Sequence, residues 1–172
     1  MKADIVIEWP NFYTATIYHW KQLLSDDKFK NIITNSLHFL VDDNRIILYA
    51  FVIMSNHIHL IWQVKANHIR TDVQLNFMRY TAQQMQCELK ENSPALLQEF
   101  KVNKQDRKYQ FWKREALSIE LFTAAVFYQK LDYIHNNPVR AGLCANAEEY
   151  YYSSAYFYQT GVDKFGMLSH YG

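Results

Sequence analysis

The chain has 172 residues, of which 49% are hydrophobic and 16% aromatic, so one folded domain with its own core is expected and a disordered tail is excluded. Only four glycines and three prolines argue against collagen-like or linker-rich sequence, and no apolar run approaches the ~20 residues of a transmembrane helix. The formal net charge of +1 is uninformative by itself, because a nucleic-acid-binding protein of this composition would need its basic residues gathered on one face.

Two features bear on the cellular compartment. The two cysteines, Cys87 and Cys144, fit reduced thiols better than a disulfide framework. The segment from Met1 to Pro10 carries two acidic residues and lacks the cationic-then-apolar pattern of a signal peptide. We therefore expect a cytoplasmic protein with no membrane partner.

The first forty residues predict a strand followed by a helix. Residues 11–18 are rich in aromatic and β-branched side chains, which favour a strand. Residues 20–40 have apolar side chains near helical spacing. A break is expected around Ser25, Asp26 and Asp27, where a capping side chain could restart the helix.

A hairpin is predicted next. Residues 45–54 are almost wholly apolar, which is typical of a central strand covered on both faces. Ser55 and Asn56 form a tight connection to a second strand over residues 57–64.

The second strand of this hairpin carries two histidines. Because side chains alternate along a strand, His57 and His59 point to the same face, and a continuous apolar face lies opposite. Two adjacent imidazoles can hold a metal ion from two points. The alternative is that one histidine is a satisfied polar group and the other is simply exposed.

The middle of the chain contains a second helix and the most basic segment. Residues 69–90 carry a ragged apolar stripe, residues 91–108 predict a loop with a helical turn at 95–100, and residues 109–121 predict a strand that turns near Arg114. The basic residues of this segment either lie in a solvated loop or contact phosphate groups, and the sequence leaves both alternatives open. These basic residues are Lys101, Lys104, Arg107, Lys108, Lys113 and Arg114.

A third helix is predicted from residue 124 to Asn137, with Thr123 as its N-cap. Pro138 disfavours the helical conformation beyond that point. Tyr133 and Asn137 are four residues apart and therefore neighbours on one face, which they share with Lys130. The tyrosine-rich residues 140–172 are expected to form a tail packed over the domain.

The order of elements is strand, helix, strand, strand, helix, strand, helix. This order is typical of a ferredoxin-like α+β sandwich, also seen in RNA-recognition (RRM-like) domains, with an antiparallel sheet and packed helices. No repeat or linker divides the chain, so residues 1–172 are expected to form a single domain.

These elements suggest a phosphodiester-processing site. Asn137 could add an amide oxygen to the two imidazoles and leave coordination positions open, as a metal needs to polarise a phosphodiester. Mg²⁺ or Mn²⁺ fits a substrate oxygen better than closed tetrahedral zinc does. Tyr133 could act as a nucleophile assisted by Lys130, although most of the chain's 13 tyrosines must be structural.

Two segments resemble a known family. Residues 54–59, Met-Ser-Asn-His-Ile-His, and residues 132–143, from Asp132 through Tyr133, Asn137 and Pro138 to Leu143, resemble the REP-associated tyrosine transposases, which belong to the single-tyrosine HUH transposases. Residues 111–115 and 149–155 resemble the middle and the C-terminal part of that family. The likeness covers most of the chain, from about residue 12 to residue 171.

The resemblance implies an HUH transposase domain over residues 1–172, with residues 140–172 as its tail. It implies that His57, His59 and Asn137 bind Mg²⁺ or Mn²⁺ and that Tyr133 is the nucleophile. The activity it implies is the cleavage and rejoining of single-stranded DNA near a hairpin, of the REP type or at an insertion-sequence end, through a 5′-phosphotyrosine. A homodimer is one implied state. The candidate DNA contacts are Lys113, Arg114 and Arg140.

Two other functions are considered. A nucleotide hydrolase with three alternating histidines is excluded because Ile61 occupies the third position. A non-catalytic DNA- or RNA-binding module of the same fold, including a transposase that no longer cleaves, remains the alternative. Together, His57, His59, Tyr133 and Asn137 favour the enzyme.

Overall fold

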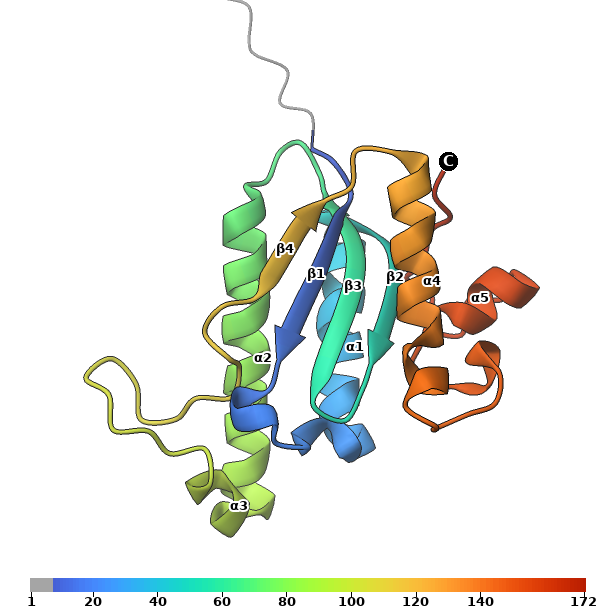
Figure 1. Ribbon diagram of the computed structural model, residues 1–172. Coiled ribbons are helices and arrows are strands. Elements are labelled where there is room, and N and C mark those ends of the chain that lie inside the picture. Colours follow the sequence, from blue (N-terminus) through green and yellow to red (C-terminus); the bar gives the residue numbers. More distant parts are fainter. Residues whose placement is uncertain (1–7) are drawn as a thin grey trace, which may run out of the picture.

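A computed structural model describes residues 8–172 (Figure 1). The expectation that residues 1–10 are not a signal peptide concerns mostly residues 1–7, which lie outside the described residues. Four antiparallel strands form one sheet in the order β2-β3-β1-β4, and helices pack on both of its faces. The strands are β1 (Asn11–Thr16), β2 (Ile46–Ile53), β3 (His57–Val64) and β4 (Leu117–Glu120). This is the ferredoxin-like α+β arrangement that the order of elements predicts.

Five α-helices accompany the sheet in the described residues. Helices α1 and α2 cover one face, and α4 covers part of the other (Figure 1). The helices are α1 (Asp27–Asp42), α2 (Arg70–Asn92), α3 (Pro94–Gln98), α4 (Ala124–Arg140) and α5 (Ala155–Thr160). None of the helices in residues 8–172 combines the length and hydrophobicity needed to cross a membrane.

The predicted break before α1 is confirmed. Two short 3₁₀ turns, Tyr18–Trp20 and Leu23–Ser25, precede the helix. Asp26 then caps α1, because its side chain accepts a hydrogen bond from the backbone N–H of Lys28 at 3.0 Å.

The β2–β3 hairpin is also confirmed, and its sides are buried as predicted. Ser55 and Asn56 form the turn, closed by a hydrogen bond from the Met54 N–H to the His57 carbonyl at 2.9 Å. On β3, the apolar face opposite the histidines is fully buried beneath α1 and α2. It consists of Ile58, Leu60, Trp62 and Val64. Burying these side chains stabilises the strand by roughly 1.5–3 kcal/mol for each residue.

The region between α3 and β4 differs from the prediction. A strand was predicted over residues 109–121, but regular pairing with β1 covers only Leu117–Glu120. Residues 109–116 instead lie along α2 and touch the sheet through one isolated bridge, between Ile17 and Trp112. Trp112 is anchored to the helix because its indole N–H donates to Thr81 at 3.0 Å. This side-chain contact and two backbone hydrogen bonds beside Trp112 hold the segment in place of a regular ladder.

Helix α4 passes the residue at which its end was predicted. Pro138 lies inside the helix, which continues to Arg140. A proline this close to the C-terminus removes only one hydrogen bond from the final turn. Gly142, with φ of 73°, follows the end of the helix, and the N–H groups of Gly142 and Leu143 donate to the carbonyls of Val139 and Pro138.

The C-terminal segment lies along the outer edge of β2, on the right in Figure 1. The Ile53 N–H donates to Tyr152, the Ser154 N–H donates to Phe51, and the Ser169 N–H donates to Leu48. These bonds satisfy backbone groups of an edge strand that would otherwise be free to pair with another chain. Helix α5 within this segment was not predicted.

A half-buried histidine, His135, joins α4 to this segment. Nε2 of His135 lies 2.8 Å from the hydroxyl of Ser154, and burial lowers the pKa of His135 to about 4. In the unfolded chain the pKa returns to about 6.5. Above pH 6.5 the imidazole is neutral in both states, so it adds no pH dependence there. As the pH falls from 6.5 toward 4, the unfolded chain takes up the proton first, and the free energy of unfolding decreases.

We therefore expect the free energy of unfolding to decrease less between pH 7 and pH 4.5 in the His135→Gln variant than in the unmodified protein. Urea unfolding at several pH values measures this difference. His68→Gln is the control, because His68 makes no side-chain hydrogen bond within residues 8–172. Equal acid sensitivity of His135→Gln and the unmodified protein would contradict the prediction.

Candidate active site

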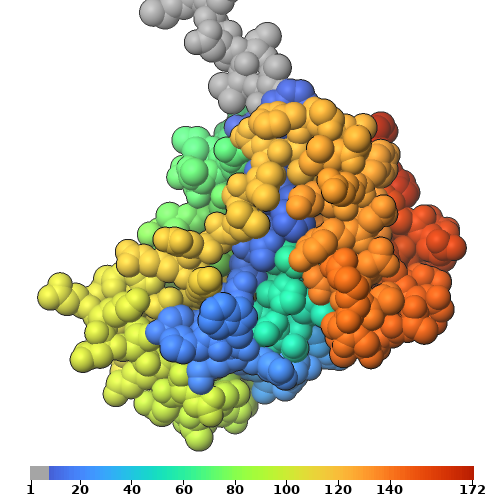
Figure 2. Space-filling model, viewed as in Figure 1, coloured from blue at the N-terminus to red at the C-terminus, as the bar shows by residue number. Residues whose placement is uncertain are grey.

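The two histidines of β3 lie side by side on the face of the sheet that α4 partly covers. Their ring centroids are 4.8 Å apart. His59 is 5% exposed, whereas His57 is half-buried at the end of the strand. This region appears in Figure 2 as a hollow, with β1 and β3 visible between α4 and the segment around β4.

Each imidazole is oriented by a hydrogen bond at Nδ1. Antiparallel pairing places Thr14 of β1 opposite His59, and the Thr14 hydroxyl lies 2.7 Å from Nδ1 of His59. The amide oxygen of Asn56 lies 2.7 Å from Nδ1 of His57. Both Nε2 atoms are left for another partner, which is how metal-binding histidines are commonly oriented by neighbouring groups.

The environment favours neutral imidazoles. Burial, followed by the charges of His57, Arg140 and Lys130, lowers the pKa of His59 to about 3. Burial also lowers the pKa of His57. Metal ions bind neutral imidazole, so both rings are in the metal-binding form near neutral pH.

Helix α4 brings Tyr133 to the histidine pair. The buried stripe of the helix packs on the sheet and places Tyr133 at its border. The Tyr133 ring meets the His59 ring edge-on at 5.3 Å between centroids and meets Phe12 at 6.0 Å. Tyr133 remains 41% exposed, so a substrate can reach this side chain.

Two cations flank this tyrosine. The Lys130 ammonium lies 5.7 Å from the Tyr133 ring centroid and 4.8 Å from that of Phe12. The Arg140 guanidinium lies 4.5 Å from the Tyr133 ring centroid and donates to the Tyr133 carbonyl at 3.2 Å. Arg140 was predicted as a DNA contact, and it lies within the site itself.

Asn137 lies one helical turn beyond Tyr133 and is partly exposed. Its side-chain amide has no hydrogen-bond partner within residues 8–172, so no hydrogen bond joins it to either histidine there. The same residues contain no group of three His, Cys, Asp or Glu side chains that could hold a metal. A third protein ligand beside His57 and His59 would therefore be of another type, and an amide oxygen is one.

Lys113 and Arg114 are not part of this cluster. They lie in the segment before β4, with exposed side chains. Lys113 is positioned over Trp20, 5.2 Å from the ring centroid. Its backbone N–H donates to Thr16 at 2.7 Å, one strand away from His57.

Two solved structures are similar to this chain. One is a REP-associated tyrosine transposase bound to a REP hairpin, with a TM-score of 0.68 and 15% sequence identity, covering 100% of this chain and 94% of that protein. The other is a protein of Deinococcus radiodurans R1 that is provisionally assigned as a transposase, with a TM-score of 0.52 and 16% identity, covering 79% of this chain and 95% of that protein.

The two comparisons made at the level of sequence found no match. No protein-family model matches the chain, and no curated protein does either. The expected resemblance to REP-associated tyrosine transposases is therefore confirmed as a shared fold over the whole chain. The roles of individual residues, the metal and the homodimer stay predictions.

Sequence reasoning missed three residues of the site. Phe12 stacks on His59 with 5.4 Å between centroids, Thr14 orients the same ring, and Asn56 orients His57. Asn56 precedes His57 directly, so its proximity was available as a signal. Phe12 and Thr14 could be found only with the register between β1 and β3.

The Asn56 contact predicts a tautomer. Because an amide oxygen only accepts, the His57 ring must donate from Nδ1 and is protonated there when neutral. We expect ¹⁵N-edited NMR at pH 7.5 to show the Nδ1–H form, and Asn56→Ala to shift the ring toward the commoner Nε2–H form. An Nε2–H tautomer in the unmodified protein would contradict this geometry.

Proposed function

We propose that this protein cleaves and rejoins single-stranded DNA at Tyr133, as a transposase of the single-tyrosine HUH type. The observation that carries the proposal is the contact between the Tyr133 ring and His59, whose ring lies beside that of His57. The shared fold with a REP-associated tyrosine transposase supports it. The proposed place of action is the cytoplasm.

The proposed reaction is a transesterification. The Tyr133 oxygen attacks the scissile phosphorus and loses its proton to solvent. The bond to the 3′ oxygen breaks, and this oxygen takes up a proton to leave as a free 3′-OH. The strand remains joined through a 5′-phosphotyrosine, and attack by a 3′-OH reverses the step. Because the bond energy is kept in the covalent link, no nucleotide cofactor is needed.

The two cations at the site, Lys130 and Arg140, suit a bound phosphate group. Lys130 and Arg140 lie on the same side of the site as the exposed Tyr133 ring, and they can offset the charge that develops on the phosphate oxygens. Next to the site, β4 exposes Leu117 and Ile119, which offer apolar surface to unstacked bases.

The donor set fits Mn²⁺ or Mg²⁺ held jointly with DNA. Two neutral imidazoles from His57 and His59 and the amide oxygen of Asn137 supply three ligands and no negative charge. When bound, the metal would polarise the scissile phosphate. Nearby Lys130 and Arg140 oppose a bare cation, so the phosphate of the substrate is expected to strengthen metal binding.

The proposal is tested by a covalent-adduct assay. Labelled single-stranded DNA carrying the hairpins that flank the gene is mixed with protein and Mn²⁺ or Mg²⁺, and the products are separated on a denaturing gel. We expect a shifted, metal-dependent protein band that is lost in Tyr133→Phe and reduced at least 100-fold in His57→Ala. Tyr128→Phe, on the same helix and similarly exposed, is the matched control and should retain the band.

Other outcomes point elsewhere. DNA binding without any adduct, over several flanking substrates and both metals, would support the non-catalytic binding module. An adduct that survives Tyr133→Phe would reject Tyr133 as the nucleophile.

A second prediction tests how the imidazoles are oriented. Thr14→Val keeps the shape of the side chain but removes the hydroxyl at Nδ1 of His59. We expect Mn²⁺ affinity in the presence of DNA to fall about 10- to 100-fold, as is typical when a group that orients a metal ligand is lost. Isothermal titration with Mn²⁺ and Tyr133→Phe protein measures this without turnover. Thr16→Val, at the adjacent same-face position of β1, is the control.

A further inference from the structure

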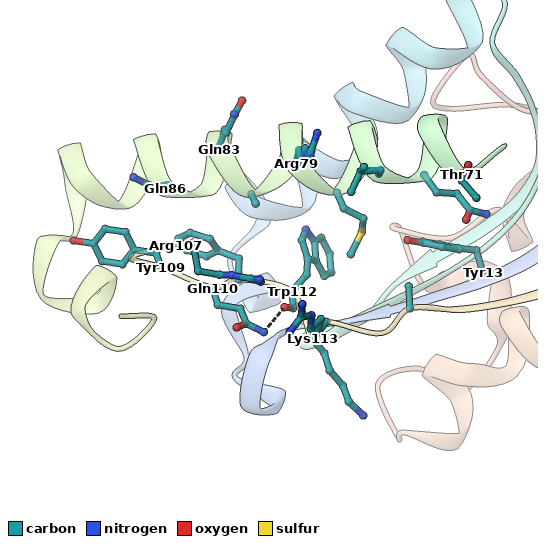
Figure 3. A pocket seen from close by; sticks show the side chains of 17 residues that line it. Tyr13, Thr71, Arg79, Gln83, Gln86, Arg107, Tyr109, Gln110, Trp112 and Lys113 are labelled. Atoms are coloured by element: carbon teal, nitrogen blue, oxygen red, sulfur yellow. Dashed lines mark hydrogen bonds between the residues drawn. The ribbon is translucent and has the colours of Figure 1, made fainter. Parts of the chain in front are cut away.

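A groove of about 580 Å³ lies between α2 and residues 107–116, away from the histidine pair (Figure 3). Helix α2 runs along one side, and the segment containing Tyr109, Gln110 and Trp112 runs along the other. Its volume is within the ~300–1,000 Å³ typical of ligand sites. No role in the proposed transesterification uses this groove.

The groove is positively charged. Four cationic residues and no acidic residue line it. They are Arg79, Arg107, Lys113 and Arg114. Only Arg107 has an ion-pair partner within residues 8–172, Asp106 at 2.6 Å. Arg79, Lys113 and Arg114 are therefore available to an anionic ligand, in a chain whose net charge is only +1. The Lys113 side chain extends away from α2, toward the end of the groove nearest Trp20 (Figure 3).

The base of the groove is apolar and aromatic. Phe111 and Trp112 are buried there, and Met78 and Ala82 of α2 lie opposite them. Gln83 and Gln86 stand along the helix with Arg79 and make no side-chain hydrogen bond within the described residues (Figure 3). Their amides can donate to and accept from the edges of bases.

This combination distinguishes between types of anion. A duplex keeps its bases stacked, so it cannot place their flat faces on the apolar base of the groove. An unpaired strand can place bases on apolar and aromatic surface while its phosphates meet cations at the rim. An acidic peptide would match the charges but not the apolar base.

The groove is connected to the proposed catalytic site. Lys113 lines the groove and is positioned over Trp20, which is 63% exposed. His19 and Trp20 both have positive φ, 57° and 52°, a conformation that is costly for residues other than glycine. The Trp20 carbonyl accepts from Asn56 at 3.4 Å, and Asn56 contacts His57.

The path between the two sites is short. Thr16 pairs with His57, and Lys113 donates its backbone N–H to Thr16. Two strand spacings, about 10 Å, therefore separate the backbones of His57 and Lys113, and the groove begins beside Lys113 on the opposite face of the sheet. A few nucleotides can span this distance and pass around the sheet edge.

We infer that this groove binds unpaired nucleotides of the DNA strand that Tyr133 cleaves, a few nucleotides from the scissile phosphate. The inference rests on the proposed function for the identity of the strand. The observations that carry it are the unpaired cations at the rim, the apolar base and the connection through Lys113 and Trp20.

The test compares two double variants with the same change in charge. Arg79→Gln with Arg114→Gln removes two groove cations. Lys90→Gln with Lys164→Gln removes two exposed cations outside it, neither with an ion pair in residues 8–172. Binding of a fluorescent 20-nucleotide oligo-dT is measured by anisotropy, at several salt concentrations and without metal.

We expect the groove variant to bind about tenfold more weakly and its salt slope to be shallower by about 1.4, as for the loss of two phosphate contacts to a single strand. The control variant should match the unmodified protein. Ala82→Phe fills the groove without changing charge, and it should weaken binding while leaving the salt slope in place. Circular dichroism verifies that each variant is folded.

Equal binding by the groove and control variants would overturn the inference. So would displacement of the oligonucleotide by poly-L-glutamate at equal charge concentration, because a simple anion-binding surface would then suffice. The adduct assay separates the two proposals. Normal adduct formation by both groove variants rejects the groove but leaves the transesterase. Groove-dependent binding of oligo-dT with no adduct from any protein supports the groove but rejects the chemistry.

Discussion

The antiparallel pairing of β1 with β3 is the constraint on which the site depends. Its register sets Thr14 opposite His59 and Thr16 opposite His57. A shift by one residue would turn every side chain of β3 to the other face, placing the imidazoles in the core and Trp62 in solvent. The four buried apolar residues of β3 therefore fix the histidines as firmly as any contact that the histidines make themselves.

Much of this arrangement is readable from the sequence because it follows local periodicity. Alternation along residues 57–64 places both histidines on one face, and the 3.6-residue stripe of α4 separates Phe127 and Ile134 from Tyr133. These patterns predict the elements and which face each residue occupies. They do not predict which face of the sheet packs against which helix, because that packing depends on the order of the strands.

The parts that sequence reasoning missed depend on contacts between distant segments. Thr14 could not be assigned to His59 without the β1–β3 register. Residues 109–116 have the composition of a strand, yet the contact of Trp112 with Thr81 holds them along α2. Pro138 has a local preference to end a helix, but it is buried and lies near the natural end of α4. In each case tertiary packing outweighs a local preference.

The position of Tyr133 relative to the histidines is set by a different part of the chain. The two imidazoles belong to the rigid sheet, whereas the tyrosine is carried by a helix that follows it in sequence and packs on it through one apolar stripe. The C-terminal segment holds this helix in place from the far side. His135 contacts Ser154, and the Tyr150 hydroxyl donates to the Ile53 carbonyl at 2.7 Å.

These links give the C-terminal segment a role in the geometry of the site, although none of its residues makes a hydrogen bond or ring contact with His57 or His59. Backbone bonds from Ile53 and Ser154 attach it to β2, and the His135 side chain attaches it to α4. The segment is therefore bonded both to the sheet and to the helix that carries Tyr133. The separation between Tyr133 and the two histidines therefore depends on the packing of β3, α4 and the C-terminal segment. The sheet fixes the imidazoles, whereas the position of the tyrosine also depends on the contacts at the β2 edge.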